Sequence, residues 1–394
     1  MNFDALTAYL DSLEAKYAIP GLDCKIMRSH EVLYRHTCGH SDYQKKIPVN
    51  GTELYDIYSA TKLFTMVAVL QLVEKGKLSL EDDLTSYIPE FAETKVLEGF
   101  NIRAFPPQKP DPSLLSHVHR NRIRIADLMS MTAGLSYDLE HPAITELLKA
   151  SAYQADTLTV VREGISRLPL YFEPGTRYFY SLSHDVLAAV VELVSGERFS
   201  EYLQRHIFAP LGIEEAYMHP GEKEKPRMAA QWRVSDETGK VLPEDTGNKY
   251  RFTANYDSGG AGLTCSVDAY SLFIDALACG GVGRTGERIL MPESIRQMST
   301  PRLNELQQKD FGRGCIGYSY GLGVRTMIYP SKAKSPVGEF GWDGAAGAFC
   351  LVDPVNHLSI FYAQQVLNML RAYFCVHPTV RDLTYDCLRQ AQEL

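Results

Sequence analysis

The chain has 394 residues, of which 45% are hydrophobic and 22% charged, so it is long enough to bury a large core. Its net charge of −8 and isoelectric point of about 5.8 disfavour nucleic acid as a partner, because phosphate binding needs a basic surface. The chain lacks both the apolar run of about 18 residues typical of a membrane span and a secretion-signal pattern, so we expect a cytoplasmic protein without membrane contact.

The N-terminal quarter of the chain predicts a helix, a hairpin and a second helix. Residues 1–17 have the spacing of an amphipathic helix. Two apolar stretches within 21–39 flank the polar residues 28–30, which indicates a β-hairpin. Residues 59–75 are apolar on most sides, so we expect a buried helix that ends at Gly76.

Residues 79 to about 250 are mainly helical segments and loops. Helices are expected over 127–131, 143–152, 157–167 and 184–195. Gly196 suits the end of the last of these, because glycine readily adopts the left-handed conformation that closes a helix.

From residue 257 the pattern returns to mixed helix and strand. Helices are expected over 267–278, 292–298 and 379–392, and strands over 318–328, 348–352 and 358–365. Strand-forming segments thus lie at both ends of the chain. They predict an α/β fold in which residues 1–78 and 255–394 form one discontinuous domain and residues 79–254 a mainly helical insertion.

The start of the second helix carries a candidate nucleophile. Ser59 and Lys62 form an S-x-x-K pattern, and positions i and i+3 share a helix face. Burial would lower the pKa of the lysine, so that its neutral amine can act as a general base toward the serine hydroxyl. A second S-x-x-K begins at Ser331, but it lies in a polar loop between two prolines. On the local pattern alone, Ser59 could instead be a helix cap beside a snorkelling lysine.

Another pattern competes with this one. Residues 317–321 match G-x-S-x-G, the nucleophile elbow of α/β-hydrolases, with Ser319 at its centre. An elbow needs a helix directly after the serine, whereas Gly321–Val324 is expected to continue as a glycine-rich strand. We therefore favour Ser59.

Three further segments resemble one known family. Residues 172–181 read FEPGTRYFYS, residues 341–347 read GWDGAAG, and residues 129–135 read MSMTAGL. Together with the glycine-rich segment 259–263, these segments resemble motifs of the class C β-lactamase-related serine hydrolases. The motifs follow one another along this chain in the same order as in that family. That family includes D-Ala-D-Ala peptidases, family VIII carboxylesterases and acyltransferases related to the lovastatin-making enzyme. The resemblance implies the β-lactamase/D,D-peptidase-like fold, an antiparallel sheet flanked by helices with an all-helical insertion.

The resemblance also implies roles for individual residues. Ser59 would form an acyl-enzyme, and Tyr180 would share a proton with Lys62, whose adjacent positive charge would lower the phenol's pKa. The backbone N–H groups of Ser59 and Ala345 would form the oxyanion hole, with Gly344 allowing close approach of the substrate. This chemistry requires neither a metal nor an organic cofactor.

Two motifs depart from the β-lactamase pattern and change the expected substrate. Leu182 stands where an asparagine usually binds the substrate amide, and Trp342 with Asp343 stands where a cation usually holds the substrate carboxylate. An anionic Asp343 would repel that carboxylate. We therefore expect a carboxylesterase for neutral, partly apolar small-molecule esters, with Phe340, Trp342 and Tyr137 lining the acyl pocket.

Three different functions are also compatible with the sequence. The same acyl-enzyme could be transferred to an alcohol or amine acceptor, or the substrate could be an amide, as in a weak β-lactamase or D-aminoacyl peptidase. The protein could also be a non-catalytic binding protein, although Ser59, Lys62 and Tyr180 are all present. The pattern does not indicate an oligomeric state.

Overall fold

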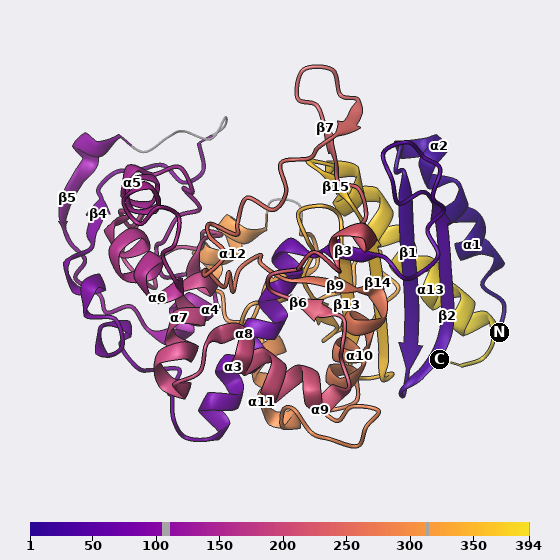
Figure 1. Cartoon of the computed structure of the whole chain (residues 1–394). Coiled ribbons are helices and arrows are strands. Elements are labelled where there is room, and N and C mark those ends of the chain that lie inside the picture. The colour runs from indigo at the N-terminus through magenta and orange to yellow at the C-terminus, as the bar shows by residue number, and fades with distance from the viewer. Residues whose placement is uncertain (105–110, 313–314, 394) are drawn as a thin grey trace.

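A seven-stranded antiparallel sheet joins the two ends of the chain (Figure 1). The computed structural model describes residues 1–104, 111–312 and 315–393. The strands lie in the order β10 (Tyr318–Tyr320), β11 (Arg325–Met327), β12 (Phe340–Gly341), β13 (Phe349–Asp353), β14 (Leu358–Gln364), β1 (Gly21–Arg28) and β2 (Glu31–Gly39). The predicted N-terminal hairpin thus pairs directly with a C-terminal strand, because β1 is antiparallel to β14.

Helices cover both faces of this sheet. The helices are α1 (Asp4–Asp11) with α2 (Leu13–Tyr17) and α13 (His377–Gln390) on one face, and α10 (Val267–Ala278) on the other. Side chains of β14 alternate between the two cores: Ile360 packs with the α1 and α13 side, and Phe361 with the α10 side. The two chain ends therefore lie side by side, as Figure 1 shows.

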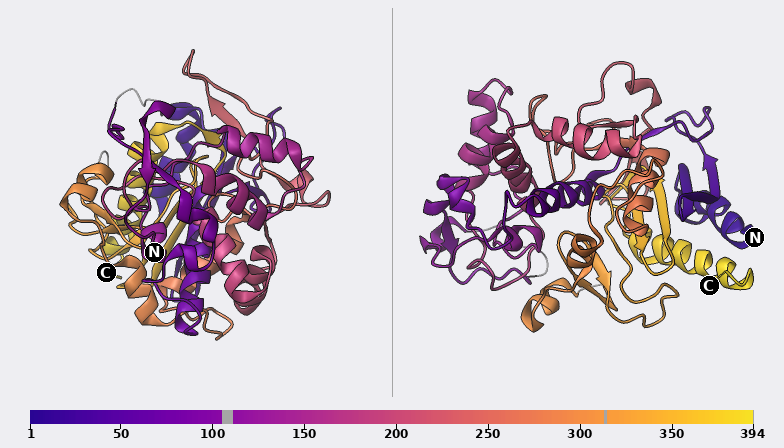
Figure 2. Two further views of the ribbon diagram at one scale, coloured as in Figure 1. Left: turned by 90° about the vertical axis from the view of Figure 1, so that its left-hand side faces the viewer. Right: turned by 90° about the horizontal axis from the view of Figure 1, so that it is seen from below.

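A buried helix connects this sheet to the middle of the chain. A short 3₁₀ turn at Tyr58–Thr61 leads into α3 (Lys62–Glu74), which packs against α7 (Ser183–Ser195) and lies at the centre of the molecule (Figures 1 and 2). The helix starts at the predicted place, but Ser59 lies in the 3₁₀ turn and the α-helix proper begins at Lys62.

The segment 79–254 holds helices together with short strands. Its elements are β4 (Lys95–Leu97), β5 (Leu115–Val118), α4 (Ile125–Met129), α5 (Pro142–Ala150), α6 (Thr157–Thr159) with turns that continue to Arg167, α7, α8 (Phe199–Leu203), α9 (Ala209–Leu211), β6 (Ala216–Tyr217), β7 (Trp232–Val234) and β8 (Val241–Pro243). As predicted, α7 ends at Gly196 in the left-handed conformation. The division at residues 78 and 255 stays a prediction, since β6 and β7 pair with strands outside the segment.

The remaining elements are short. They are β3 (Leu54–Asp56), β9 (Thr264–Ser266), α11 (Pro292–Ser299), α12 (Glu305–Phe311) and β15 (Val366–Leu367). The predicted glycine-rich strand at 321–324 is wrong: these residues bend between β10 and β11, and Gly323 has a φ of +75° that a strand does not allow. Of the helices described here, none is both long enough and apolar enough to cross a membrane.

Phe64, on α3, tests how far the fold depends on this buried helix. Its ring stacks on Phe273 of α10 with centroids 3.8 Å apart and is 1% exposed. Phe64→Ala should lower the free energy of unfolding by about 3–5 kcal/mol, because it removes a buried aromatic ring and leaves a cavity. Thermal denaturation measures the loss, and Phe64→Leu, which keeps more of the volume, is the milder control. A loss for Phe64→Ala no larger than that for Phe64→Leu would contradict this account of the core.

Candidate active site

Ser59 and Lys62 lie together at the entrance to α3. The Lys62 amine is 3.3 Å from Ser59 Oγ, because residues i and i+3 eclipse one another in a 3₁₀ turn. The preceding residue, Tyr58, has a φ of +46°, an unfavourable conformation for a bulky residue. Such local strain is common where the backbone must present a reactive side chain. Ser59 itself remains partly exposed.

The Lys62 amine is completely buried and is held by neutral groups. It donates to the Gly260 carbonyl at 2.7 Å and to the Tyr137 hydroxyl at 3.4 Å, and it lies 4.7 Å from the centre of the Tyr180 ring. Burial lowers the pKa of Lys62 from 10.5 to about 7, while the charge of Asp185 opposes that shift. Much of the amine is therefore neutral at physiological pH and can accept a proton from Ser59.

Tyr180 lies beside this pair in a way that only partly matches the expectation. Trp342 Nε1 donates to its hydroxyl at 3.0 Å, and a hydrogen bond also links that hydroxyl to Ser59. The predicted lowering of its pKa is wrong: burial raises the pKa of Tyr180 above its ordinary value, more than those two hydrogen bonds lower it. Because the Lys62 amine is charged only in part near pH 7, it supplies less than a full positive charge to ionise the phenol. Tyr180 is thus a protonated group that can donate.

Aromatic rings surround the reactive atoms. Tyr137 stacks on Tyr180 with centroids 5.5 Å apart, and Tyr180 stacks on Trp342 at the same distance. Tyr250 meets the edge of Tyr137 at 5.6 Å. All four rings are partly exposed, so the rim of the site around Ser59 is aromatic.

The candidate oxyanion donors are backbone N–H groups of Ser59 and Ala345. Gly344 is packed so closely that an added Cβ would lie 2.3 Å from the Ile57 carbonyl oxygen, which only glycine permits. Tyr373 holds the same segment, donating to the carbonyls of Gly344 at 2.9 Å and Ala345 at 3.2 Å. This packing brings Ala345 close to the turn that carries Ser59, as an oxyanion hole requires.

Two other predicted side chains are placed differently from the expectation. The Asp343 carboxylate pairs with Arg325 at 2.8 Å and lies 3.5 Å from His377 Nδ1. Burial acts to raise the pKa of Asp343, but the charges of Arg325 and His377 outweigh it and hold that pKa below its ordinary value. Asp343 is thus ionised with its charge paired. The placement of Phe340 in the acyl pocket is wrong, because its side chain is fully buried in the main core.

The competing serines are not placed for catalysis. Ser319 is buried inside β10, and a bend and another strand follow it instead of the helix that an elbow needs. Ser331 lies in an exposed turn, and Lys334, its S-x-x-K partner, pairs with Asp386.

Sequence reasoning missed several residues that complete the site. Gly260 holds the Lys62 amine, Tyr373 holds the 344–345 segment, and Asp185 lies behind Gly260. The glycine pair within 259–263 was a usable signal for close packing, although its role was not evident. Tyr373 and Asp185 have no local pattern that separates them from other tyrosines and aspartates.

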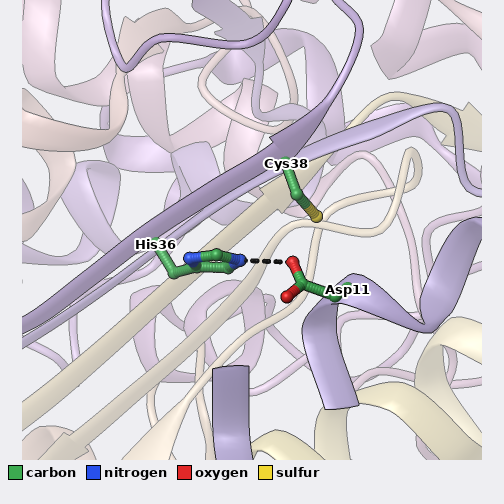
Figure 3. A group of neighbouring side chains, drawn as sticks. All are labelled: Asp11, His36 and Cys38. Carbon is green, nitrogen blue, oxygen red and sulfur yellow. Dashed lines mark hydrogen bonds and ion pairs between the residues drawn. The ribbon is translucent and has the colours of Figure 1, made fainter. Parts of the chain in front are cut away.

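Several cavities and polar clusters lie away from these residues. Cavities of about 410 and 530 Å³ are lined by neither Ser59, Lys62 nor Tyr180. Figure 3 shows Asp11, His36 and Cys38, in which His36 Nε2 lies 2.7 Å from Asp11 Oδ1. Burial first, and then the neighbouring acidic charges, raise the pKa of Cys38 to about 12, so this thiol is protonated at neutral pH. We regard the cluster as a polar contact between α1 and β2.

The fold and the Ser–Lys–Tyr arrangement define a serine hydrolase of the penicillin-recognising type. The chain belongs to the beta-lactamase family, whose model matches residues 6–371.

Relatives named as hydrolases share most of its length. Esterase EstB of Burkholderia gladioli is 26% identical over 90% of this chain and 88% of its own. A putative D-alanyl-D-alanine carboxypeptidase of Escherichia coli K12 is 25% identical over 89% and 79%. Among solved structures, simvastatin synthase LovD from Aspergillus terreus superposes with a TM-score of 0.79 at 21% identity, covering 99% of this chain and 100% of that one. This last likeness concerns the fold.

The pH dependence of activity tests Lys62 as the base. Since only the neutral amine accepts a proton, kcat/KM for a neutral ester should rise with pH through a midpoint near 7. Lys62→Arg keeps a permanent charge, so it should lower kcat/KM by at least about 100-fold. Lys75→Arg, at the exposed end of the same helix, is the matched control and should leave the profile unchanged. A rate independent of pH from about 5 to 9 would contradict the assignment.

Proposed function

We propose that the protein is a carboxylesterase that hydrolyses neutral, partly apolar small-molecule esters through an acyl-enzyme on Ser59. The observation that carries this proposal is the hydrogen bond from Trp342 Nε1 to the Tyr180 hydroxyl, at 3.0 Å. An aromatic side chain thus occupies the position where related enzymes that act on carboxylate-bearing substrates place a cation. The nearby cation Arg325 is itself paired with Asp343.

The proposed mechanism is a sequence of proton transfers. The neutral Lys62 amine takes the Ser59 proton as Oγ attacks the ester carbonyl carbon, and the resulting oxyanion accepts hydrogen bonds from the Ser59 and Ala345 N–H groups. When the carbon–oxygen bond breaks, the departing alcohol takes a proton from the Tyr180 phenol, which recovers one from the Lys62 ammonium. Water then attacks the acyl-enzyme with Lys62 again as base, releasing the acid and free Ser59.

Acyl transfer is the second candidate. An alcohol or amine that reaches the acyl-enzyme can replace water in the last step without any other change in mechanism. The relatives support this candidate, since acyltransferase calJ of Penicillium decumbens is 25% identical over 92% of each chain. The partition between acid and transfer product, measured as an acceptor alcohol is added, separates the two activities.

Hydrolysis of amides and a purely binding role have less support. Leu182 is 1% exposed and has no group to bind a substrate amide, which disfavours efficient turnover of β-lactams or D-alanyl peptides. A non-catalytic role would leave the lowered pKa of a buried lysine beside a serine without a purpose. The cytoplasmic location stays a prediction.

Covalent labelling tests Ser59 as the nucleophile. A fluorophosphonate probe should attach to Ser59, and Ser59→Ala should abolish labelling and lower kcat/KM at least about a thousand-fold, because the bond-forming oxygen is gone. Mass spectrometry of the labelled peptide locates the adduct, and Ser331→Ala is the control that should label normally. An adduct on Ser319 would overturn the mechanism.

Substitution of Trp342 tests the proposed substrate class. Trp342→Ala removes aromatic surface at the rim and one hydrogen bond to Tyr180, so it should change the ratio of kcat/KM values among p-nitrophenyl esters of different chain length by about 10-fold or more. Trp342→Phe keeps a ring but loses the hydrogen bond, which separates packing from hydrogen bonding. An unchanged ratio in both variants would contradict the placement of the acyl group beside Trp342.

A further inference from the structure

The buried carboxylate of Asp185 takes no part in the proton transfers between Ser59, Lys62 and Tyr180. Asp185 lies in the first turn of α7 and is 1% exposed. Its Oδ1 accepts from the Ser258 hydroxyl at 2.7 Å, the Tyr256 hydroxyl at 2.8 Å and the Gly260 N–H at 3.4 Å. Its Oδ2 has no hydrogen-bond partner among the described residues. A carboxyl group in such a place is costly to the fold and calls for a role.

A single peptide unit separates this carboxyl from Lys62. Gly260 donates its N–H to Asp185 Oδ1 and accepts at its carbonyl from the Lys62 amine at 2.7 Å. A Cβ at this position would lie 2.4 Å from Asp185 Oδ2, so glycine is what permits the carboxyl to pack directly behind the amine. The two ionisable groups are therefore fixed relative to one another by Gly260.

The contacts favour the ionised form of Asp185. All three hydrogen bonds run toward Oδ1, and a proton on Oδ2 would find no acceptor among the described residues. Burial raises the pKa of Asp185 above its ordinary value, and these donors and the charge of Lys62 limit that rise without cancelling it.

The neighbouring Asp257 carboxylate is paired with Arg198, and the other titratable groups that face the pair carry no charge near neutral pH. Burial first, and then the charge of Lys62, lower the pKa of His184 well below 6.5, so this ring is neutral. Burial raises the pKa values of the four tyrosines that face the pair, Tyr137, Tyr180, Tyr250 and Tyr256, above 10. Asp185 is thus the charged group placed to act on Lys62.

We propose that Asp185 is a positioning residue for Lys62. The ionised carboxylate of Asp185 acts across the Gly260 peptide: it holds the Lys62 amine at Ser59 and stabilises the proton that this amine takes up. The proposal rests on the proposed esterase function. It explains why Lys62 remains basic enough to accept the serine proton although it is fully buried. The proton moves from Ser59 Oγ to Lys62 and then, through the Tyr180 phenol, to the departing alcohol, and Asp185 neither gains nor loses one.

The pH profile of Asp185→Asn tests this role. The amide keeps the shape and an acceptor oxygen but removes the negative charge, so the lysine proton becomes less stable. The midpoint of the acid limb of kcat/KM should move below its wild-type value by about one pH unit, because an opposite charge a few ångströms away shifts a pKa by about that much. Above the midpoint, kcat/KM should fall less than about ten-fold.

Thr65→Val is the matched control. Thr65 is buried and donates to the carbonyl of Gly259 at 2.6 Å, so the variant loosens the same glycine pair without removing a charge. It should lower thermal stability and leave the midpoint unchanged. Equal shifts in Thr65→Val and Asp185→Asn, or no shift in Asp185→Asn, would overturn the proposal.

A second variant tests the same role if Asp185→Asn does not fold. Ser258→Ala removes one donor to the carboxylate and should shift the midpoint in the same direction by a smaller amount, and no shift in this variant would count against the proposal. The pH dependence of fluorophosphonate labelling of Ser59 gives the same midpoint without turnover. If Ser59→Ala keeps full activity, the proposed function itself fails. If activity depends on Ser59 but the midpoint of the pH profile does not move in Asp185→Asn, only the role of Asp185 is overturned.

Discussion

The burial of the Lys62 amine is the constraint on which the rest of the site depends. The folded protein releases this proton near pH 7, whereas an exposed lysine keeps it up to about 10.5. Because the pKa is lower in the folded state, the contribution of Lys62 to stability rises as pH rises from about 7 to 10.5. At pH 7 and below, the buried amine costs the fold about 5 kcal/mol relative to alkaline conditions. In the proposed mechanism, the gain is a base that works at neutral pH.

That cost explains the packing around the amine. A buried ammonium needs hydrogen-bond acceptors, and the fold supplies the Gly260 carbonyl and the face of the Tyr180 ring. Both come from segments far from α3 in sequence, one before β9 and one before α7, so only long-range contacts satisfy the amine. The glycines at 260 and 344 serve one purpose, since each lets backbone approach where a side chain would collide.

Much of this arrangement could be predicted from the sequence, for physical reasons. The hairpin, α10 and the start of α3 have strong local patterns, and Ser59 with Lys62 follows from spacing on one turn. Phe340 was misplaced because β12 ends at Gly341, so strand alternation does not carry Phe340 and Trp342 to the same surface. The ionisation of Tyr180 was misjudged because it depends on whether Lys62 is charged, which only burial decides. Tyr373 and Asp185 were missed because long-range contacts alone define them.

The structure also changes the reason for expecting neutral substrates. From the sequence, Asp343 was expected to repel a substrate carboxylate, but its charge is paired with Arg325 and offers little net repulsion. The stronger argument is the aromatic character of the site: the partly exposed rings of Tyr137, Tyr180, Tyr250 and Trp342 are uncharged and stack on one another beside Ser59. A substrate carboxylate placed there would lose hydration without gaining an ion pair, which is unfavourable in a partly buried site. An uncharged acyl group would gain from the same rings, so the proposed preference for neutral esters would follow from desolvation alone.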